Sequence, residues 1–258
     1  MEISLSGRAA IVTGGSKGIG LAVATRFAAS GAEVAIVART AEPLEEAVAS
    51  IRKSTQSRVI GVQADISKPA DIQRAYDEVM KAFDKVDIVV NNAGTSQAMP
   101  FEKLTDDILR DDLELKLFAA VRLIRLVVPQ MKERRWGRII NVLNIGAKAP
   151  RPNSMPTSVS RAVGMAMTKA LSHELAPHNV LVNAMHVGII RADQHVQRAK
   201  RNNVPLDEYY KAHEKEIPIG RVGEAEEFAN LACFLVSEQG GYITGTAINV
   251  DGGRSPVV

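Results

Sequence analysis

The stretch AAIVTGGSKGIGLAVA at residues 9–24 decides the fold class. It begins with a short apolar run that is typical of a strand and ends in a helical pattern, with Gly14, Gly18 and Gly20 between them. A glycine turn at such a junction lets backbone N–H groups approach a pyrophosphate, and the helix N-terminus adds a favourable field. The stretch therefore predicts a dinucleotide site.

The alternation of strand and helix continues along the whole chain. Further apolar or β-branched runs, each separated from the next by a helical pattern, span residues 33–38, 58–64, 86–91, 138–143, 180–187 and 246–250. Such alternation indicates parallel strands joined by crossover helices, hence an α/β doubly wound sheet. No repeat or linker interrupts it, so we expect residues 1–258 to form a single domain.

Residues 189–217 break this alternation, because they are polar and charged and carry no strand signal. An insertion after the carboxyl end of a strand in an open α/β sheet lies over the crevice where ligands bind. We expect a substrate lid, and a solvated helical excursion is the alternative. Val196, Val204, Leu206 and Tyr209 suggest a partly apolar pocket beneath it.

Composition and charge exclude several function classes. The chain is 46% hydrophobic and 24% charged, close to an average globular protein, and its net charge is +3. No apolar run reaches the roughly 18 residues of a membrane span and no signal peptide is visible, so we expect a cytoplasmic protein without membrane contact. The basic run at residues 132–138 is typical of a solvated helix end, so nucleic-acid binding is not expected. Cys233 lies in an apolar run and is assigned to the core, and no metal site is expected.

The end of the second predicted strand bears on the choice of cofactor. A carboxylate there would bind an adenosine ribose and repel a 2′-phosphate, but the chain has Ala38, Arg39 and Thr40. Lys17 lies within the glycine turn. Two cations and no acid favour NADP(H) over NAD(H), although both could be ordinary surface charges.

Three motifs, TGGSKGIG at 13–20, NNAG at 91–94 and YITGTAINVDGG at 242–253, make the chain closely resemble the short-chain dehydrogenase/reductase family over nearly its whole length. The resemblance implies a Rossmann-type oxidoreductase that binds NAD(P)(H) and forms a homo-oligomer, a tetramer or dimer. The cofactor contacts that the resemblance implies are Thr13, Gly14, Ser16, Lys17, Gly18, Ile19, Gly20, Arg39, Asp65, Ile66, Asn92, Ala93, Gly94, Arg161, Gly188 and Ile189. Of these, Asp65 could instead be a helix N-cap.

The catalytic positions of the family carry other residues here. Aligned through TKAL at 168–171 and RIINV at 138–142, the family's Asn, Ser, Tyr and Lys fall on Lys116, Asn144, Thr157 and Arg161. No tyrosine lies between residues 77 and 208. Tyr209 and Tyr210 in the lid could swing inward, which we do not favour. The resemblance thus implies an atypical active site.

The replacing groups could still do chemistry. Asn144 can donate to a substrate oxygen, and Arg161 keeps a positive charge that could hold ribose hydroxyls. Lys116, if buried beside a second cation, should have a lowered pKa and could act as the acid; it could instead point out of its helix. His186 could shuttle protons, but a packing role is favoured. Near it, Val187 and Ala192 replace the family's usual Pro and Thr at the nicotinamide turn.

Three functions follow from these observations. The favoured one is an NADP(H)-dependent oxidoreductase with an altered proton relay, acting on a small carbonyl, alcohol or activated double bond. The second is a catalytically inactive cofactor-binding protein or partner subunit, because all four relay members are replaced. A lyase or isomerase that reuses the pocket is the third. The intact glycine turn favours the first.

Overall fold

Seven parallel strands form the central sheet of the computed structural model, which describes residues 3–258. Their spatial order is β3-β2-β1-β4-β6-β8-β9, so the chain builds outward from β1 in one direction and then, from β4, in the other. The predicted doubly wound α/β sheet is confirmed. The strands are β1 (Ala9–Thr13), β2 (Glu33–Ala38), β3 (Val59–Gln63), β4 (Ile88–Asn91), β6 (Gly137–Asn144), β8 (Val180–Val187) and β9 (Ala247–Val250).

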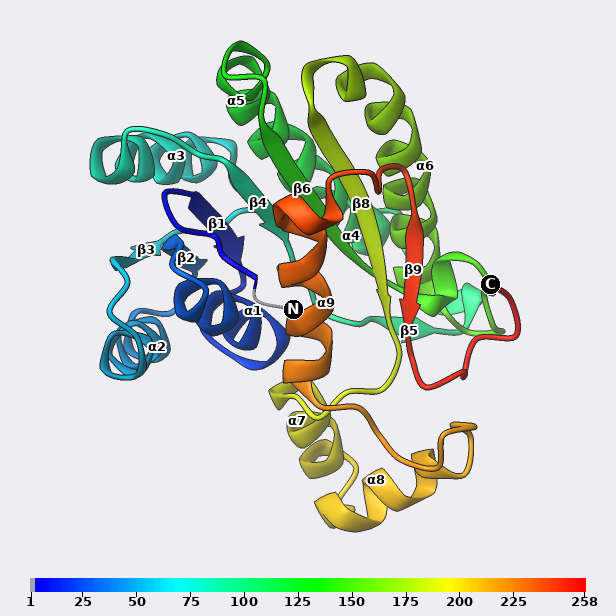
Figure 1. Ribbon diagram of the computed structural model, residues 1–258. Coiled ribbons are helices and arrows are strands. Elements are labelled where there is room, and N and C mark those ends of the chain that lie inside the picture. Colours follow the sequence, from blue (N-terminus) through cyan, green and yellow to red (C-terminus); the bar gives the residue numbers. More distant parts are fainter. Residues whose placement is uncertain (1–2) are drawn as a thin grey trace.

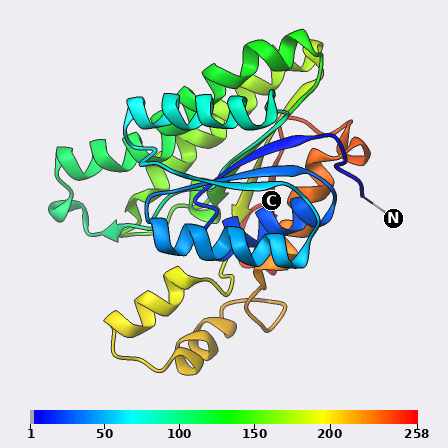
Figure 2. The same ribbon diagram turned by 90° about the vertical axis from the view of Figure 1, so that its left-hand side faces the viewer.

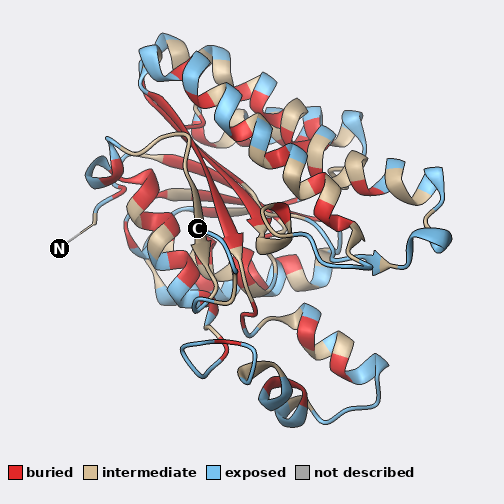
Figure 3. Ribbon diagram, turned by 90° about the vertical axis from the view of Figure 1, so that its right-hand side faces the viewer, coloured by how far each residue is buried: buried red, intermediate tan, exposed pale blue. Residues whose placement is uncertain are grey.

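Helices cover both faces of the sheet (Figure 2). One face packs against α1 (Gly18–Ala29), α2 (Ala41–Ser54) and α9 (Ala225–Val236). The other packs against α3 (Pro69–Phe83), α5 (Ala119–Glu133) and α6 (Thr157–Leu175). Burial on both faces explains why the central strands read as continuous apolar runs. Figure 3 shows these strands buried and the outer helix faces exposed, whereas the edge strand β9 is half-buried.

Residues 106–133 form one continuous helix with a wider turn in its middle. It consists of α4 (Asp106–Leu113), a π-helical turn (Glu114–Phe118) and α5. The Thr105 hydroxyl caps its start by accepting from the Ile108 N–H at 3.3 Å. A π-turn adds a residue to one helical turn and often marks a functional site.

The segment between β8 and α9 forms two further helices, α7 (Asp193–Arg201) and α8 (Leu206–Glu214). They lie together beyond the carboxyl ends of β8 and β9 (Figure 1). A small apolar cluster, which includes Ala199, Tyr210 and Ile217, holds them to each other and to the adjoining chain.

Several short elements complete the described chain. An antiparallel pair, β5 (Ala98–Met99) and β7 (Met155–Pro156), was not predicted, because two residues carry no periodicity. No helix in residues 3–258 combines the length and apolarity that a membrane crossing requires. The remaining turns are 3-10 helices at Phe101–Lys103, Ile145–Ala147, Ala176–His178 and Glu238–Gly240.

Candidate active site

A cavity of about 660 Å³ opens at the carboxyl edge of the sheet, between the glycine turn, the end of β6 and the helix α7. It lies where the strand order reverses, which is the usual ligand position in open α/β sheets. The structure places most of the predicted site residues on its wall: Gly14, Ser16, Lys17, Gly18, Ile19, Gly20, Arg39, Ile66, Asn92, Ala93, Gly94, Asn144, Thr157, Arg161, Gly188 and Ile189.

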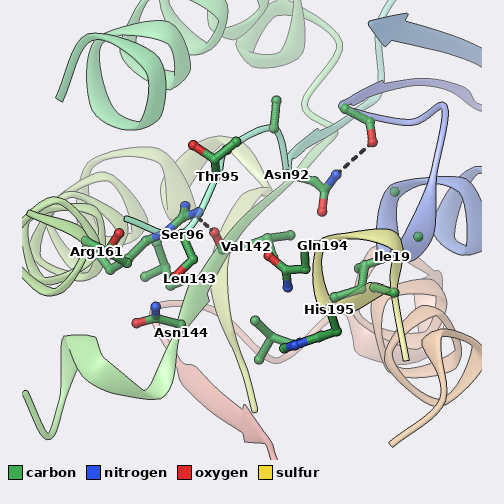
Figure 4. Close-up of a pocket in the computed structure, with 18 of the residues that line it drawn as sticks. Ile19, Asn92, Thr95, Ser96, Val142, Leu143, Asn144, Arg161, Gln194 and His195 are labelled. Atoms are coloured by element: carbon green, nitrogen blue, oxygen red, sulfur yellow. Dashed lines mark hydrogen bonds between the residues drawn. The ribbon is translucent and has the colours of Figure 1, made fainter. Parts of the chain in front are cut away.

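Thr13 does not line this cavity and instead supports its floor. Its buried hydroxyl accepts from the N–H groups of Asn92 at 3.0 Å and Ala93 at 3.1 Å. The Asn92 amide donates to the carbonyls of Thr13 at 2.9 Å and Gly14 at 3.1 Å. These bonds tie the end of β4 to the glycine turn, and Asn92 is held in place beside the cavity (Figure 4).

Asp65 lies in an adjoining depression, which shares Arg39 with the cavity. Its carboxylate accepts from the N–H of Ser67 at 3.1 Å and from the Ser67 hydroxyl at 2.8 Å. Burial opposes ionisation, but the two bonds from Ser67 and the charge of Arg39 outweigh it and lower the pKa of Asp65. The carboxylate thus stabilises the turn that leads into α3.

The glycine turn fits the pyrophosphate of a dinucleotide. Gly14 and Gly18 have positive φ angles of 64° and 54°. A Cβ at Gly14 would lie 2.9 Å from the Cα of Ala93. No side chain caps the start of α1 and no acidic residue occupies its first turn, so its free N–H groups favour an anion.

Lys116 and Thr157 meet behind the cavity wall. The ammonium of Lys116, fully buried on the π-turn, donates to Asp112 and to Thr157 Oγ1, the latter at 3.0 Å. Thr157 Oγ1 also accepts from the N–H of Gln97 at 2.9 Å. Lys116 therefore points inward, and only Thr157 of the two reaches the cavity.

Asp112 was missed in the sequence. It is buried and also accepts from the Ser160 hydroxyl at 2.6 Å. Its spacing of four residues from Lys116 was the available signal, but an acid at this spacing on a helix is usually a solvated partner. Here both members of the pair are buried.

Burial sets the charge balance of this cluster. It lowers the pKa of Lys116 to about 8, helped by the charge of Arg161 and opposed by Asp112. Burial also lowers the pKa of Arg161 to about 10, again against the effect of Asp112. At neutral pH both groups are cations, and Lys116 is the one that can release a proton.

Arg161 and Asn144 lie on the cavity wall (Figure 4), which Thr157 also lines. Arg161 donates to the Val142 carbonyl at 2.8 Å, and a Cβ on Gly94 would lie 2.8 Å from its guanidinium. The buried Oδ1 of Asn144 and Nε of Arg161 have no hydrogen-bond partner among the described residues.

His186 cannot serve as a proton shuttle near neutral pH. It is fully buried on β8, does not line the cavity, and finds no partner for either ring nitrogen in the described chain. Burial, with Lys148 and Arg161 nearby, lowers its pKa to about 4. The favoured packing role fits this position. Cys233 is likewise buried, beside the Ser30 hydroxyl at 3.3 Å.

The four residues 196, 204, 206 and 209 are expected from the sequence to give a partly apolar pocket. Of these, Tyr209 lines the cavity, and Val204 is exposed. Tyr209 faces the cavity without any swing and its hydroxyl bonds with His195 Nδ1 at 3.0 Å. Tyr210 instead packs against the Arg191 guanidinium, 4.5 Å from its ring centre. The helical periodicity did not reveal that the polar face of α7 points inward.

Comparison with known proteins agrees with this geometry. The family model described as enoyl-(acyl carrier protein) reductase matches residues 14–255. The chain is 33% identical over 253 residues to the 3-oxoacyl-[acyl-carrier-protein] reductase FabG of Aquifex aeolicus, covering 98% of this chain and 99% of that protein. It is 32% identical over 254 residues to human dehydrogenase/reductase SDR family member 4, covering 96% and 88%.

The chain belongs to the short-chain dehydrogenase/reductase family. Among solved structures, the L-sorbose reductase of Gluconobacter frateurii, complexed with NADPH and L-sorbose, superposes over 100% of both chains with a TM-score of 0.94 at 35% identity. The protein is thus an oxidoreductase of the short-chain dehydrogenase/reductase type.

Proposed function

We propose that this short-chain dehydrogenase/reductase is an NADP(H)-dependent reductase of small carbonyl compounds, in which Lys116 supplies the proton through Thr157. The observation that carries the proposal is the 3.0 Å hydrogen bond from the Lys116 ammonium to Thr157 Oγ1. Thr157 stands on the cavity wall and Lys116 lies behind it. Together they offer a proton path at the position of the family's tyrosine.

The cofactor half of the cavity supports NADP(H). The glycine turn would hold the pyrophosphate, and Lys17 and Arg39 would face the 2′-phosphate. Neither cation forms an ion pair within residues 3–258, so both charges are available. The sorbose reductase was solved with NADPH. When bound, NADPH supplies the hydride.

Thr157 is oriented to pass a proton into the cavity. Its oxygen accepts two hydrogen bonds, from Lys116 and from the Gln97 N–H, which fills its acceptor capacity. Its own O–H would then be left to donate to a substrate oxygen in the cavity. As the substrate oxygen gains negative charge, it takes the Thr157 proton while Lys116 gives one to Thr157 Oγ1. Thr157 ends unchanged and Lys116 ends neutral.

Lys116 suits this role by its pKa. An acid works best when its pKa lies near the working pH, and the value of about 8 meets that condition. A free threonine hydroxyl is too weak an acid to act alone. Asp112 holds the ammonium in place and keeps it charged below that pH.

Asn144 and Arg161 complete the proposed site. Asn144 would donate from its amide to the substrate oxygen and stabilise the charge that develops there. Arg161, fixed by the Val142 carbonyl, would hold the ribose side of the cofactor and keep a positive field beside Thr157.

A two-stage experiment tests the proposal. Fluorescence titration should show binding of NADPH and weaker binding of NADH, and a carbonyl panel should then oxidise NADPH in the wild type but scarcely in Thr157→Val. NADPH binding without turnover of any carbonyl would favour the inactive-subunit alternative. Turnover that is equal in Thr157→Val would contradict the proton path.

A further inference from the structure

The cavity wall carries a large excess of positive charge. Within the described chain, six cationic residues and one acidic residue, Asp193, line it. Asp193 is in the first turn of α7, near Gly18 of the glycine turn. The six cations are Lys17, Arg39, Arg151, Arg161, Arg198 and Arg254. The proposed cofactor site uses Lys17, Arg39 and Arg161, so three arginines are left over.

These three arginines come from three separate segments. Arg198 is on α7, Arg151 is in the loop after β6, and Arg254 follows β9. The charges of Arg198 and Arg254 both act on His195 and His213, which places the four groups in one cluster under the lid. The cluster faces the same cavity as Asn144 and Thr157.

A single carboxylate partly neutralises the cluster. Glu216 accepts from Arg254 at 2.6 Å and lies 3.5 Å from Arg151. Arg198 forms no ion pair within residues 3–258. Arg151 and Arg254 thus share one acid and Arg198 has none, and the contact with Glu216 shows that such a guanidinium group accommodates a carboxylate.

The two histidines contribute polar atoms and no charge. Burial lowers the pKa of His195 to about 4 and lowers that of His213 as well, so His195 is neutral at pH 7. His195 Nε2, His213 Nδ1 and Arg254 Nε are buried without a hydrogen-bond partner among the described residues. Buried polar atoms in that state are costly, and a polar ligand could satisfy them where the side chains turn toward it.

We propose that the substrate of this reductase carries a carboxylate, which binds Arg198 and Arg254 under the lid while its carbonyl faces Asn144 and Thr157. The substrate class is a small oxo acid. The proposal rests on the reductase function above and adds what the lid end of the cavity recognises. Neutral carbonyl compounds lack the group that this end is built to bind.

Calorimetric titration of the protein–NADP⁺ complex tests the proposal without turnover, because NADP⁺ gives no hydride to a carbonyl. The probes are acetoacetate, 4-oxopentanoate and 5-oxohexanoate, each against its methyl ester, with L-sorbose as a neutral ketose. We expect at least one acid to bind roughly tenfold or more tightly than its ester and than L-sorbose. Added NaCl should weaken the acid and leave the ester unchanged.

Two variants locate the effect. Arg198→Gln should abolish the preference for the acid and leave the ester and NADP⁺ unchanged. Lys200→Gln removes the same charge from an exposed position on the same helix and should keep the preference. An equal loss of acid preference in both variants would mean that acids respond to the overall positive potential of the protein and not to a carboxylate site, and it would overturn the proposal.

Other results also overturn it and separate it from the reductase function. Equal binding of acids and esters, tighter binding of L-sorbose, or no binding of any acid would contradict a carboxylate site. A loss of NADP⁺ affinity in Arg198→Gln would assign that cation to the cofactor. If NADP⁺ fails to bind the wild type, the reductase function fails, and the acid and ester series on the free protein still decides the carboxylate site.

Discussion

The two halves of the cavity are built differently. On the glycine-turn side, Thr13 and Asn92 each hydrogen-bond the other's backbone, and Thr13 also accepts from the N–H of Ala93. From residue 3 to residue 136, the one buried side-chain atom without a partner is Arg26 Nε, away from the cavity. Beyond residue 136, such atoms occur in eight residues of the described chain, and five of these line the cavity on the side of β6, α6 and α7: Asn144, Arg161, His195, His213 and Arg254. The other three, Arg138, His186 and Asn249, lie away from it.

This difference suits a separate role for each side of the cavity. The glycine-turn side presents backbone N–H groups and needs no further side chain to be complete, which suits a fixed cofactor. The other side holds charged and polar side chains whose hydrogen-bonding capacity is unused, which suits a polar substrate. The positions at which we expect the family's catalytic residues lie on or behind this second side: Lys116, Asn144, Thr157 and Arg161.

The largest expected effect falls on the side of β6, α6 and α7, where we propose that the substrate binds. Thr157→Val removes one hydroxyl with little change of shape and should lower kcat roughly 10²- to 10⁴-fold, because the proton path from Lys116 ends. The dissociation constant of NADPH should not change. Ser158→Ala removes a neighbouring hydroxyl, which bonds to Ser154, and serves as the control. Equal losses in both variants would show a packing effect.

Acid should lower the free energy of unfolding through the histidines, all of which lie beyond residue 172 of the chain. His186 and His195 have pKa values of about 4 against 6.5 in the unfolded chain. As the pH falls, these histidines bind protons in the unfolded chain before they do so in the folded one. The free energy of unfolding is therefore unaffected above pH 6.5 and decreases as the pH falls from 6.5 toward 4. Between pH 7 and pH 5 each should cost about 2 kcal/mol of unfolding free energy.

Urea unfolding at the two pH values measures this loss. His186→Leu should reduce the acid sensitivity by the share of one histidine, and His173→Gln, on the exposed surface of α6, should not. An unchanged pH dependence in His186→Leu would mean that its ring is not held neutral.

A glycine pair tests whether the cofactor half depends on close backbone approach. Gly14→Ala and Gly7→Ala both place an alanine at positive φ, 64° and 73°, and both should lose roughly 1–2 kcal/mol of stability. Only at Gly14 does the new Cβ meet backbone, so only Gly14→Ala should also lose NADPH binding. Titration of both folded variants checks this, and retained binding in Gly14→Ala would argue against the turn as the pyrophosphate site.

The smallest effect concerns the 2′-phosphate. Replacing Lys17 and Arg39 together by Gln should weaken NADPH binding about tenfold and leave NADH unchanged, because exposed charges contribute modestly. Lys53→Gln removes an exposed charge on α2 outside the cavity and should change neither. Parallel loss of NADH affinity would place the two cations elsewhere on the cofactor.

The sequence predicts the glycine-turn side of the cavity better than the side of β6, α6 and α7, for physical reasons. Strands buried on both faces read as apolar runs, and Glu33–Ala38 matches the prediction residue for residue, as Val180–Val187 does on the other side of the cavity. The glycine turn is also visible, because its backbone requires particular residues. Both signals are local and depend little on the rest of the fold.

The side of β6, α6 and α7 depends on contacts that no local pattern reveals. Lys116 and Asp112 look like a solvated pair on a helix, and burial against Ser160 and Thr157 makes them a coupled site. His195 lies on a helix whose polar face turns toward a cavity and away from solvent. Periodicity identifies a polar face without showing what it faces.

The pH dependence of kcat for carbonyl reduction, in the wild type and in Lys116→Met, tests whether Lys116 supplies the proton through Thr157. Lys116 donates only when protonated, so the wild-type rate should be constant below pH of about 8 and fall above it. Lys116→Met should be slow throughout and lack this decline, and the exposed variant Lys103→Met should follow the wild type. A wild-type rate with the same decline in Lys116→Met would contradict the proton path through Thr157.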